Sequence, residues 1–296
     1  MHVFVAGATG VLGRALVPRL LEQGHTVRAL VRSPERGQMI RAAGVELVSG
    51  DLLTETTAQQ LPSLVRGCDA VVHIATAIPR NPTDASAWEP TTRLRTEGTR
   101  LLLEAAQAAG ARYYVQQSIA IAYPDGGERW LDETTPLDRS PQRSTICGPV
   151  ITMEEMVQAV NPAELGWCIL RGGSFVGRGT AQDTLVARLR EGRLVVICDG
   201  SNFISPIHVA DMATAIIAAL QPAAVGRIFN IVATPVRYGE YVDHIAALLQ
   251  VPPPPRDPSM PCPPSFRCSN AAARRLLGWQ PTHDIYEDVV AAQNQP

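Results

Sequence analysis

The chain has 296 residues, a 46% hydrophobic share and a formal net charge of −2, which is enough for one large α/β core with or without a smaller lobe. The near balance of charge predicts no nucleic-acid partner and no anionic membrane surface, and no apolar run reaches the roughly 20 residues that span a bilayer. All 26 basic residues are arginine, so the chain contains no lysine.

The first 14 residues predict a strand, a glycine turn and the start of a helix. An apolar run rich in β-branched residues ends in three closely spaced glycines, and an amphipathic helical pattern follows at once. Such a turn aims backbone N–H groups and the positive end of a helix at a phosphate. We therefore predict a dinucleotide site that includes Gly7, Thr9, Gly10, Val11, Leu12, Gly13 and Arg14.

The end of the second predicted strand bears on the choice of cofactor. An acidic residue here would favour the 2′-hydroxyl of NAD, but the chain offers Arg32, Ser33 and Arg36. Guanidinium groups suit a 2′-phosphate because their planar fork donates hydrogen bonds in pairs. With Arg14, these residues favour NADP over NAD, although solvated surface arginines are the alternative.

Residues at the ends of the next strands are also expected to face the cofactor, because open parallel sheets bind ligands beyond their carboxyl edge. Asp51 is expected near the adenine ring, with helix capping as the alternative. We interpret His73 as a buried core histidine rather than a catalyst. The remaining expected cofactor contacts in this region are Leu52, Ile74, Ala75, Thr76, Gln117 and Ser118.

Strands alternate with helices through the first half, which predicts an α/β fold with a Rossmann-type doubly wound parallel sheet. We expect this core in residues 1–170, with residues 206–231 returning to it, and a smaller substrate-binding lobe in residues 171–296. Residues 123–149 are rich in Pro, Gly, Asp and Thr and predict a long functional loop.

Six cysteines are scattered without zinc spacing or a C-x-x-C pair, and no metal site is expected. Most have apolar neighbours, so they are interpreted as reduced core residues, with Cys262 and Cys268 nearer the surface. The first residues already form a strand, which leaves no room for a signal peptide and predicts a cytoplasmic protein.

Several segments together resemble the extended or atypical short-chain dehydrogenases/reductases of the nucleotide-sugar epimerase/dehydratase branch. The resemblance covers nearly the whole chain in the right order. It rests on the glycine turn and on Gly50-Asp51-Leu52, His73-Ile74-Ala75-Thr76-Ala77, Thr96-Glu97-Gly98-Thr99, Leu170-Arg171-Gly172-Gly173-Ser174-Phe175-Val176-Gly177, Ile207-His208-Val209-Ala210-Asp211 and Leu277-Gly278-Trp279-Gln280-Pro281.

The resemblance implies a catalytic Ser or Thr after the fifth strand, with Tyr and Lys four residues apart on the next helix. Ser118 stands near the serine position, with Ile119 beside it, but residues 144–151 contain neither Tyr nor Lys. The candidates that remain are Ser118, Tyr123 from the following loop, and Arg95, which occupies the place of the family's Asn. Tyr123 has packing as its alternative role, and Arg95 has a surface position.

The leading hypothesis is an NADPH-dependent oxidoreductase that acts on a small carbonyl-type substrate between the lobes. One alternative is a non-catalytic NADP-binding sensor or scaffold, because the Tyr and Lys are missing. The other is a nucleotide-sugar epimerase or dehydratase, which would need the absent base. A homodimer through the helices around Arg95 and Met156 would fit the resemblance.

Overall fold

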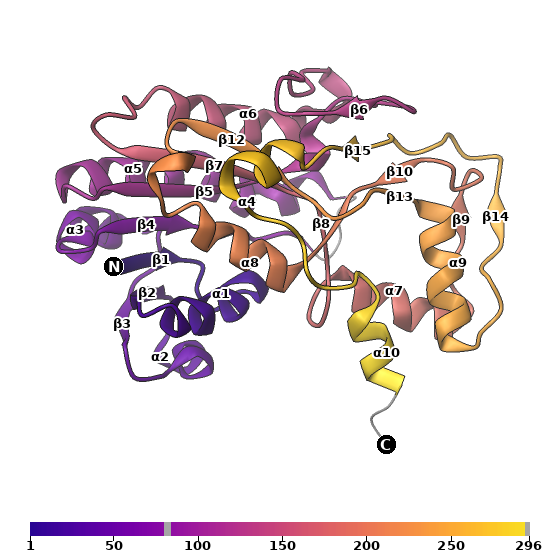
Figure 1. The fold of residues 1–296 in the computed structure, drawn as a ribbon, viewed down its shortest axis with the longest axis horizontal. Coiled ribbons are helices and arrows are strands. Elements are labelled where there is room, and N and C mark those ends of the chain that lie inside the picture. The colour runs from indigo at the N-terminus through magenta and orange to yellow at the C-terminus, as the bar shows by residue number, and fades with distance from the viewer. Residues whose placement is uncertain (80–83, 294–296) are drawn as a thin grey trace.

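The computed structural model describes residues 1–79 and 84–293. Its centre is a seven-stranded sheet with every neighbouring pair parallel, and helices cover both faces, as the α/β alternation predicts (Figure 1). The expected Rossmann-type fold class is confirmed. The order of the strands across the sheet is β12-β7-β5-β4-β1-β2-β3.

The sheet strands are β1 (His2–Ala6), β2 (Thr26–Val31), β3 (Val45–Ser49), β4 (Ala70–His73), β5 (Tyr113–Ile119), β7 (Gly166–Gly172) and β12 (Arg227–Ile231). The short strands outside it are β6 (Trp130–Leu131), β8 (Ser174–Val176), β9 (Val196–Ile197), β10 (Phe203–Ile204), β11 (Pro206–His208), β13 (Val236–Arg237), β14 (Arg256–Asp257) and β15 (Arg267–Cys268). The α-helices are α1 (Val11–Glu22), α2 (Pro34–Gly37), α3 (Glu55–Val65), α4 (Glu89–Arg93), α5 (Thr99–Ala108), α6 (Ser144–Gln158), α7 (Ala181–Arg190), α8 (Val209–Ala218), α9 (Tyr238–Leu249) and α10 (Glu287–Gln293).

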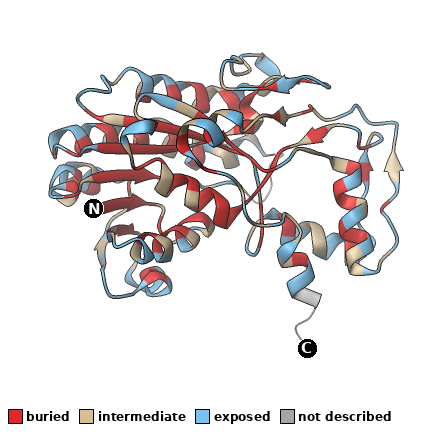
Figure 2. Ribbon diagram, viewed as in Figure 1, coloured by how far each residue is buried: buried red, intermediate tan, exposed pale blue. Residues whose placement is uncertain are grey.

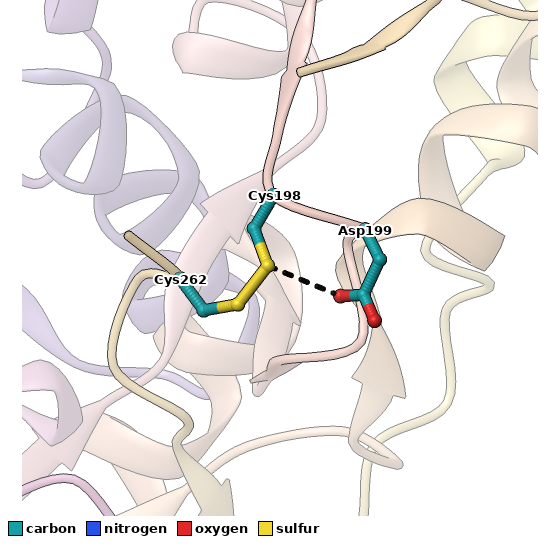
Figure 3. Close-up of side chains that lie close together, drawn as sticks. All are labelled: Cys198, Asp199 and Cys262. Carbon is teal, nitrogen blue, oxygen red and sulfur yellow. Dashed lines mark hydrogen bonds between the residues drawn. A yellow bond between two sulfur atoms is a disulfide. The ribbon is translucent and has the colours of Figure 1, made fainter. Parts of the chain in front are cut away.

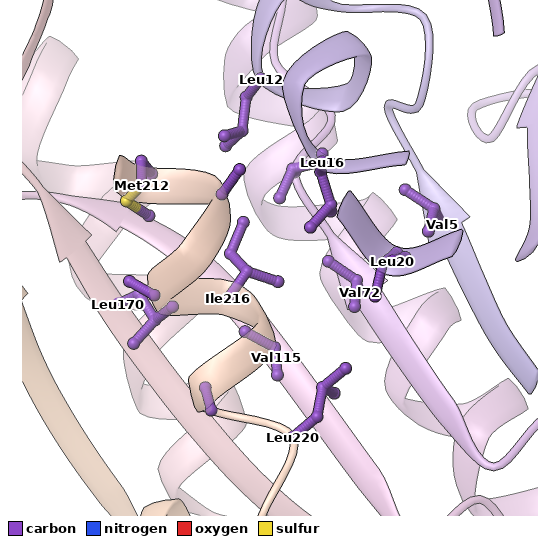
Figure 4. Close-up of a cluster of buried hydrophobic side chains, with 14 of the residues drawn as sticks. Val5, Leu12, Leu16, Leu20, Val72, Val115, Leu170, Met212, Ile216 and Leu220 are labelled. Carbon is purple, nitrogen blue, oxygen red and sulfur yellow. The ribbon is translucent and has the colours of Figure 1, made fainter. Parts of the chain in front are cut away.

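One face of the sheet is covered by α1 and α8, which pack against each other (Figure 4). Leu12, Leu16 and Leu20 follow one another at four-residue spacing, so they form a single buried stripe along α1. They meet apolar side chains of the strands such as Val72 and Val115. This packing fixes the start of α1 over the carboxyl edge of the sheet.

The other face of the sheet is covered by α3, α5 and α6. The central strands are therefore buried on both sides, as Figure 2 shows, and the four residues of β4 are all buried. Doubly buried parallel strands are typically continuous apolar runs rather than alternating ones, which matches their sequence.

The prediction of one long loop over residues 123–149 is wrong at its C-terminal end, because α6 already begins at Ser144. Pro149 lies inside this helix and removes one backbone donor. The burial of Cys147, Val150 and Met153 in one apolar cluster outweighs that local penalty. A helix, rather than a loop, therefore faces the end of β5.

The smaller lobe is built around α7, α9 and α10, beside the sheet domain in Figure 1. Within residues 206–231, β12 joins the edge of the sheet beside β7, while α8 packs on α1. The lobe boundaries at 170 and 171 stay a prediction. Among the described residues, no helix is both long enough and apolar enough to cross a membrane.

The interpretation of the cysteines as mostly reduced core residues missed one pair, because Cys198 and Cys262 form a disulfide (Figure 3). Sixty-four positions separate the two residues, so neither local spacing nor a motif announced the pair. The bond joins the end of β9 to the proline-rich segment after β14, and Asp199 Oδ1 lies 3.5 Å from Cys198 Sγ. The other four cysteines are free and buried, including Cys268, which was expected nearer the surface.

Candidate functional site

The glycine turn after β1 is closed by contacts that only glycine permits. Gly7 has a φ of +102°, and a Cβ there would lie 2.6 Å from the backbone nitrogen of Ala75. A Cβ on Gly13 would lie 2.2 Å from the carbonyl oxygen of Ala8. Gly10 begins α1 without a side-chain cap, and the first turn of the helix carries no acidic residue. No side chain of the described residues caps the N–H groups at this helix end, and such an end attracts an anion.

The structure brings the other expected cofactor contacts to the same edge. The N–H of Ile74 donates to the carbonyl of Ala6, so the end of β4 lies directly beside the glycine turn. Ala75 and Thr76 keep exposed surface, whereas Leu52 is buried against Gly98. Gln117, near the end of β5, is partly exposed.

Asp51 does not cap the helix that follows it. Thr54 does so, because its hydroxyl accepts from the N–H of Thr57, while Asp51 Oδ1 accepts from the N–H of Leu53 at 3.0 Å. The capping alternative is therefore wrong. The half-buried Asp51 side chain closes a local turn at the carboxyl edge of β3.

Arg14, Arg32 and Arg36 are all exposed. Arg14 Nη1 donates to the carbonyl of Thr9 at 3.3 Å, so its guanidinium folds back over the glycine turn. Ser33 caps α2 by accepting from the N–H of Arg36 at 3.4 Å. Within the described part of the chain, no carboxylate pairs with Arg32 or Arg36. Both guanidinium groups remain available to an incoming anion.

Ser118 belongs to a buried polar network rather than to an open site. Its hydroxyl donates to Glu154 Oε1 at 2.6 Å, and both residues are 2% exposed. The same carboxylate takes two hydrogen bonds from Arg171, from Nε at 3.0 Å and from Nη2 at 2.7 Å. Glu154 comes from α6 and Arg171 from β7, so the network joins a helix to the sheet.

Tyr123 closes the other end of this network. Its hydroxyl accepts from Arg171 Nη1 at 2.7 Å and donates to Asn230 Oδ1 at 2.9 Å. The ring is fully buried, and burial raises the pKa of the phenol well above its usual range, with partial relief from Arg171. Both sides of the hydroxyl are occupied, so this geometry is that of a packing tyrosine and not of a proton donor to a substrate.

Glu154, Arg171 and Asn230 are the polar residues that sequence reasoning missed. Arg171 stands in an apolar strand and Glu154 in the apolar stretch of α6, which is the signal of a buried pair. Neither pattern tells which partner each residue finds.

Arg95 is buried, so the expectation of a surface position is wrong. It is 4% exposed and lies in a π-helical turn, Leu94–Gly98, between α4 and α5. The turn packs against α6, so Arg95 is buried although it stands on a helix. The turn joins α4 to α5, so the three form one continuous helical run around Arg95.

His73 is the buried core histidine that its apolar strand predicts. It is 1% exposed, and Nδ1 lies 3.1 Å from Gln116 Oε1 and 3.3 Å from Thr99 Oγ1. Burial lowers its pKa to about 4, so the ring is neutral near pH 7.

Comparisons with known proteins agree with this geometry. The model of the NAD dependent epimerase/dehydratase family matches residues 3–232. A 3-diazoavenalumate denitrifying reductase from a Streptomyces species is 35% identical, and the match covers 97% of this chain and 98% of that protein. A ceramide reductase from Caulobacter vibrioides is 30% identical over 76% of this chain, which spans 62% of that enzyme.

Two solved structures with bound NAD share the fold. One is a dTDP-glucose 4,6-dehydratase from Streptomyces venezuelae, with 20% identity, a TM-score of 0.83 and coverage of 98% of this chain and 95% of that one. The other is a UDP-glucose 4-epimerase from Thermus thermophilus, with 21% identity, a TM-score of 0.79 and coverage of 98% and 97%. The expected family is thus confirmed over most of the sequence, and the chain belongs to the NAD-dependent epimerase/dehydratase family.

Proposed function

We propose that this chain is an NADPH-dependent reductase that transfers a hydride to a small substrate at the carboxyl edge of its sheet. One observation carries the proposal. The glycine turn closes as a dinucleotide-binding turn does, while α6 has neither the Tyr nor the Lys of the family. The glycine turn, the uncapped start of α1 and the end of β4 would hold the pyrophosphate and the adjoining riboses.

The free arginines support NADPH rather than NADH. Arg32 and Arg36 flank the end of β2, where a 2′-phosphate would lie, and neither is paired with a described carboxylate. Ser33 is taken up by capping α2, so its hydroxyl supports the loop and leaves the phosphate to the two arginines. Ion pairs between guanidinium and phosphate are bidentate and hence selective for the added charge.

The chemistry must proceed without the usual proton relay. The reduced nicotinamide supplies a hydride, and a carbonyl that accepts it also needs a proton. Neither tyrosine nor lysine occurs on α6, and the hydroxyls of Ser118 and Tyr123 are held in the buried network. The protein's own part is therefore to bind, orient and exclude water.

A substrate that needs no proton from the protein fits this site best. When a hydride adds to an arenediazonium ion, a C–H bond replaces the C–N bond and dinitrogen leaves with the electron pair of the broken bond. Hydride and cation balance, so no acid or base is required. The full-length relative is named as a denitrifying reductase of a diazo compound. We therefore favour a diazo-type substrate over the carbonyl that was first expected.

The test measures cofactor binding and turnover with the purified protein. We expect NADPH to bind more tightly than NADH, and 4-carboxybenzenediazonium to release one dinitrogen for each NADPH oxidised. With NADPH deuterated at C4, the deuterium should appear on the ring carbon. The blank is the Gly13→Ala variant, whose new Cβ would overlap the Ala8 carbonyl, together with a protein-free mixture. NADPH oxidation by carbonyl compounds without any dinitrogen release would restore the carbonyl reading.

A non-catalytic dinucleotide-binding protein is the second candidate, and the same missing Tyr and Lys favour it. It predicts that NADPH binds tightly and that neither the diazonium ion nor any carbonyl compound oxidises NADPH in an enzyme-dependent way. A nucleotide-sugar epimerase would instead carry NAD and convert a UDP-sugar or TDP-sugar. A homodimer through α5 and α6 remains a prediction, but the buried Arg95 side chain does not contribute to such a surface.

A further inference from the structure

Two arginines of this fold are equally buried and treated differently. Arg171 and Arg95 are each 4% exposed. Arg171 makes two hydrogen bonds to Glu154 and one to Tyr123. In the part of the chain that the structure describes, no hydrogen bond or ion pair reaches the guanidinium of Arg95. One buried cation is satisfied from within the protein, and the other is not.

An unpaired buried cation is unfavourable, because the charge loses water without gaining a counter-ion. Burial lowers the pKa of Arg95 to about 10, and the one other influence on it is the Cys147 thiol of α6. The side chain is therefore still charged near pH 7. Among the residues that the structure describes, no carboxylate influences it.

The guanidinium also keeps a path to solvent. The polar side-chain atoms that are both sealed and unpartnered among the described residues are His73 Nε2, Asn202 Oδ1 and Asp243 Oδ1. The nitrogens of Arg95 do not belong to this set, although they have no partner. They therefore keep a small surface that solvent reaches.

The position of Arg95 separates it from the pyrophosphate site. The glycine turn leads into α1, on the face of the sheet that α8 also covers. Arg95 comes from the opposite layer, where α4 and α5 meet, and its π-helical turn packs on α6. The thiol of Cys147, in the part of α6 that lacks the Tyr and Lys of the resemblance, is close enough to favour the charged form of Arg95.

We propose that Arg95 is a substrate-binding residue that takes an oxyanion, a carboxylate of the substrate, on the α6 side of the site. The planar guanidinium fork matches a carboxylate and donates two parallel hydrogen bonds to it. The assignment of this anion to the substrate rests on the proposed function. The binding of an anion at Arg95 does not, because it can be measured without any reaction. A phosphate of the dinucleotide is the other source of an oxyanion.

The test uses cinnamate and cinnamamide, which share a shape but differ in charge, as ligands of the protein with and without NADPH. Calorimetry should show that cinnamate binds the wild type and the amide binds far more weakly. In Arg95→Met, cinnamate should bind about ten- to a hundredfold more weakly, with NADPH affinity unchanged. Arg95→Lys should recover part of the loss. Arg100→Met, one turn further along on the exposed side of α5, should change neither ligand.

Thermal unfolding separates a binding role from a structural one. Because the apo protein bears an unpaired buried charge, Arg95→Met should unfold at the same or a higher temperature than the wild type, and only the wild type should be stabilised by cinnamate. Equal cinnamate binding by wild type and Arg95→Met, or none by either, overturns the proposal. A loss of NADPH affinity in Arg95→Met assigns the oxyanion to the cofactor and also overturns it. Failure of the wild type to bind NADPH, with cinnamate binding intact, overturns the proposed function alone.

Discussion

The hydroxyl of Ser118 and the guanidinium of Arg171 share one carboxylate oxygen, Glu154 Oε1, at 2.6 and 3.0 Å. Three elements meet at this atom, namely β5, α6 and β7. The serine that the resemblance placed near the chemistry therefore helps to stabilise a buried carboxylate by donating a hydrogen bond to it. Its geometry favours a structural role over a catalytic one.

The variant Ser118→Ala should consequently affect stability more than activity. Loss of a buried hydrogen bond to a charged group should lower the free energy of unfolding by about 1.5–3 kcal/mol. The rate of NADPH oxidation should stay within a few-fold of wild type. Urea unfolding and single-turnover kinetics on the same preparation measure both. An unchanged unfolding midpoint with a strongly reduced rate would return Ser118 to a catalytic role.

The variant Glu154→Ala should be strongly destabilised, because it leaves Arg171 charged and unpaired in the core. The expected loss is about 3–5 kcal/mol in the free energy of unfolding. Its neighbour offers a control, since Glu155 is exposed and pairs with Arg139 at the surface. Glu155→Gln should cost about 1 kcal/mol or less. Similar urea midpoints for the two variants would contradict this account of the network.

Arg32 and Arg36 should set the preference for NADPH. The double variant Arg32→Ala/Arg36→Ala removes both unpaired guanidinium groups at the end of β2, so NADPH should bind about tenfold more weakly or worse, and NADH should be unaffected. Fluorescence titration with each dinucleotide gives the ratio. The control is Arg41→Ala, which changes an exposed arginine between α2 and β3. An equal loss for both dinucleotides would show that these arginines do not read the 2′-phosphate.

His73 should make the protein less stable as the pH falls. The pKa of the folded protein's imidazole is about 4, against 6.5 for an unperturbed histidine. Between these values the unfolded chain holds a proton that the folded chain lacks, so stability is full above pH 6.5 and declines toward pH 4. The decline from this residue is about 3 kcal/mol. The free energies of unfolding of wild type and His73→Gln, measured from pH 7 to pH 4, should come to differ by about this amount as the pH falls. Parallel curves would refute the assignment.

The disulfide predicts a definite thiol count. Protein unfolded without reductant should expose four thiols and, after reduction, all six. Loss of the bond in Cys198→Ser should lower stability by up to about 4 kcal/mol, because the bond closes a loop with a sequence separation of 64. Cys198→Ser/Cys262→Ser should match the single variant. Six thiols before reduction would show that the two sulfurs are not bonded.

The sheet and its first turn could be predicted because they follow local rules. Apolar runs of strand length, glycine at the φ of +102° of residue 7 and the amphipathic stripe of α1 are all encoded within a few neighbouring residues. The candidate cofactor contacts followed from the same logic, since the carboxyl ends of parallel strands must share one edge.

What escaped prediction depends on tertiary contacts. The local propensity of Gly148 and Pro149 disfavours a helix. Burial of Cys147 and Val150 nevertheless stabilises α6 from Ser144 onward. An arginine on a helix is usually exposed, but the π-helical turn that carries Arg95 packs against α6 and buries it. The bonded cysteines are distant in sequence, and their pairing depends on how the smaller lobe folds.

The anchor of α6 by Glu154 divides the helix into two halves with different freedom. The second half is tied to β7 through Arg171, whereas Ser144 to Ile151 carries no charge that the sheet must satisfy. The exposed side chains of that first half, Ser144 and Thr145, can therefore be exchanged while the buried residues beside them keep the helix folded. A chain without Tyr and Lys in this part of α6 can therefore carry other reactive groups there while the sheet keeps its structure.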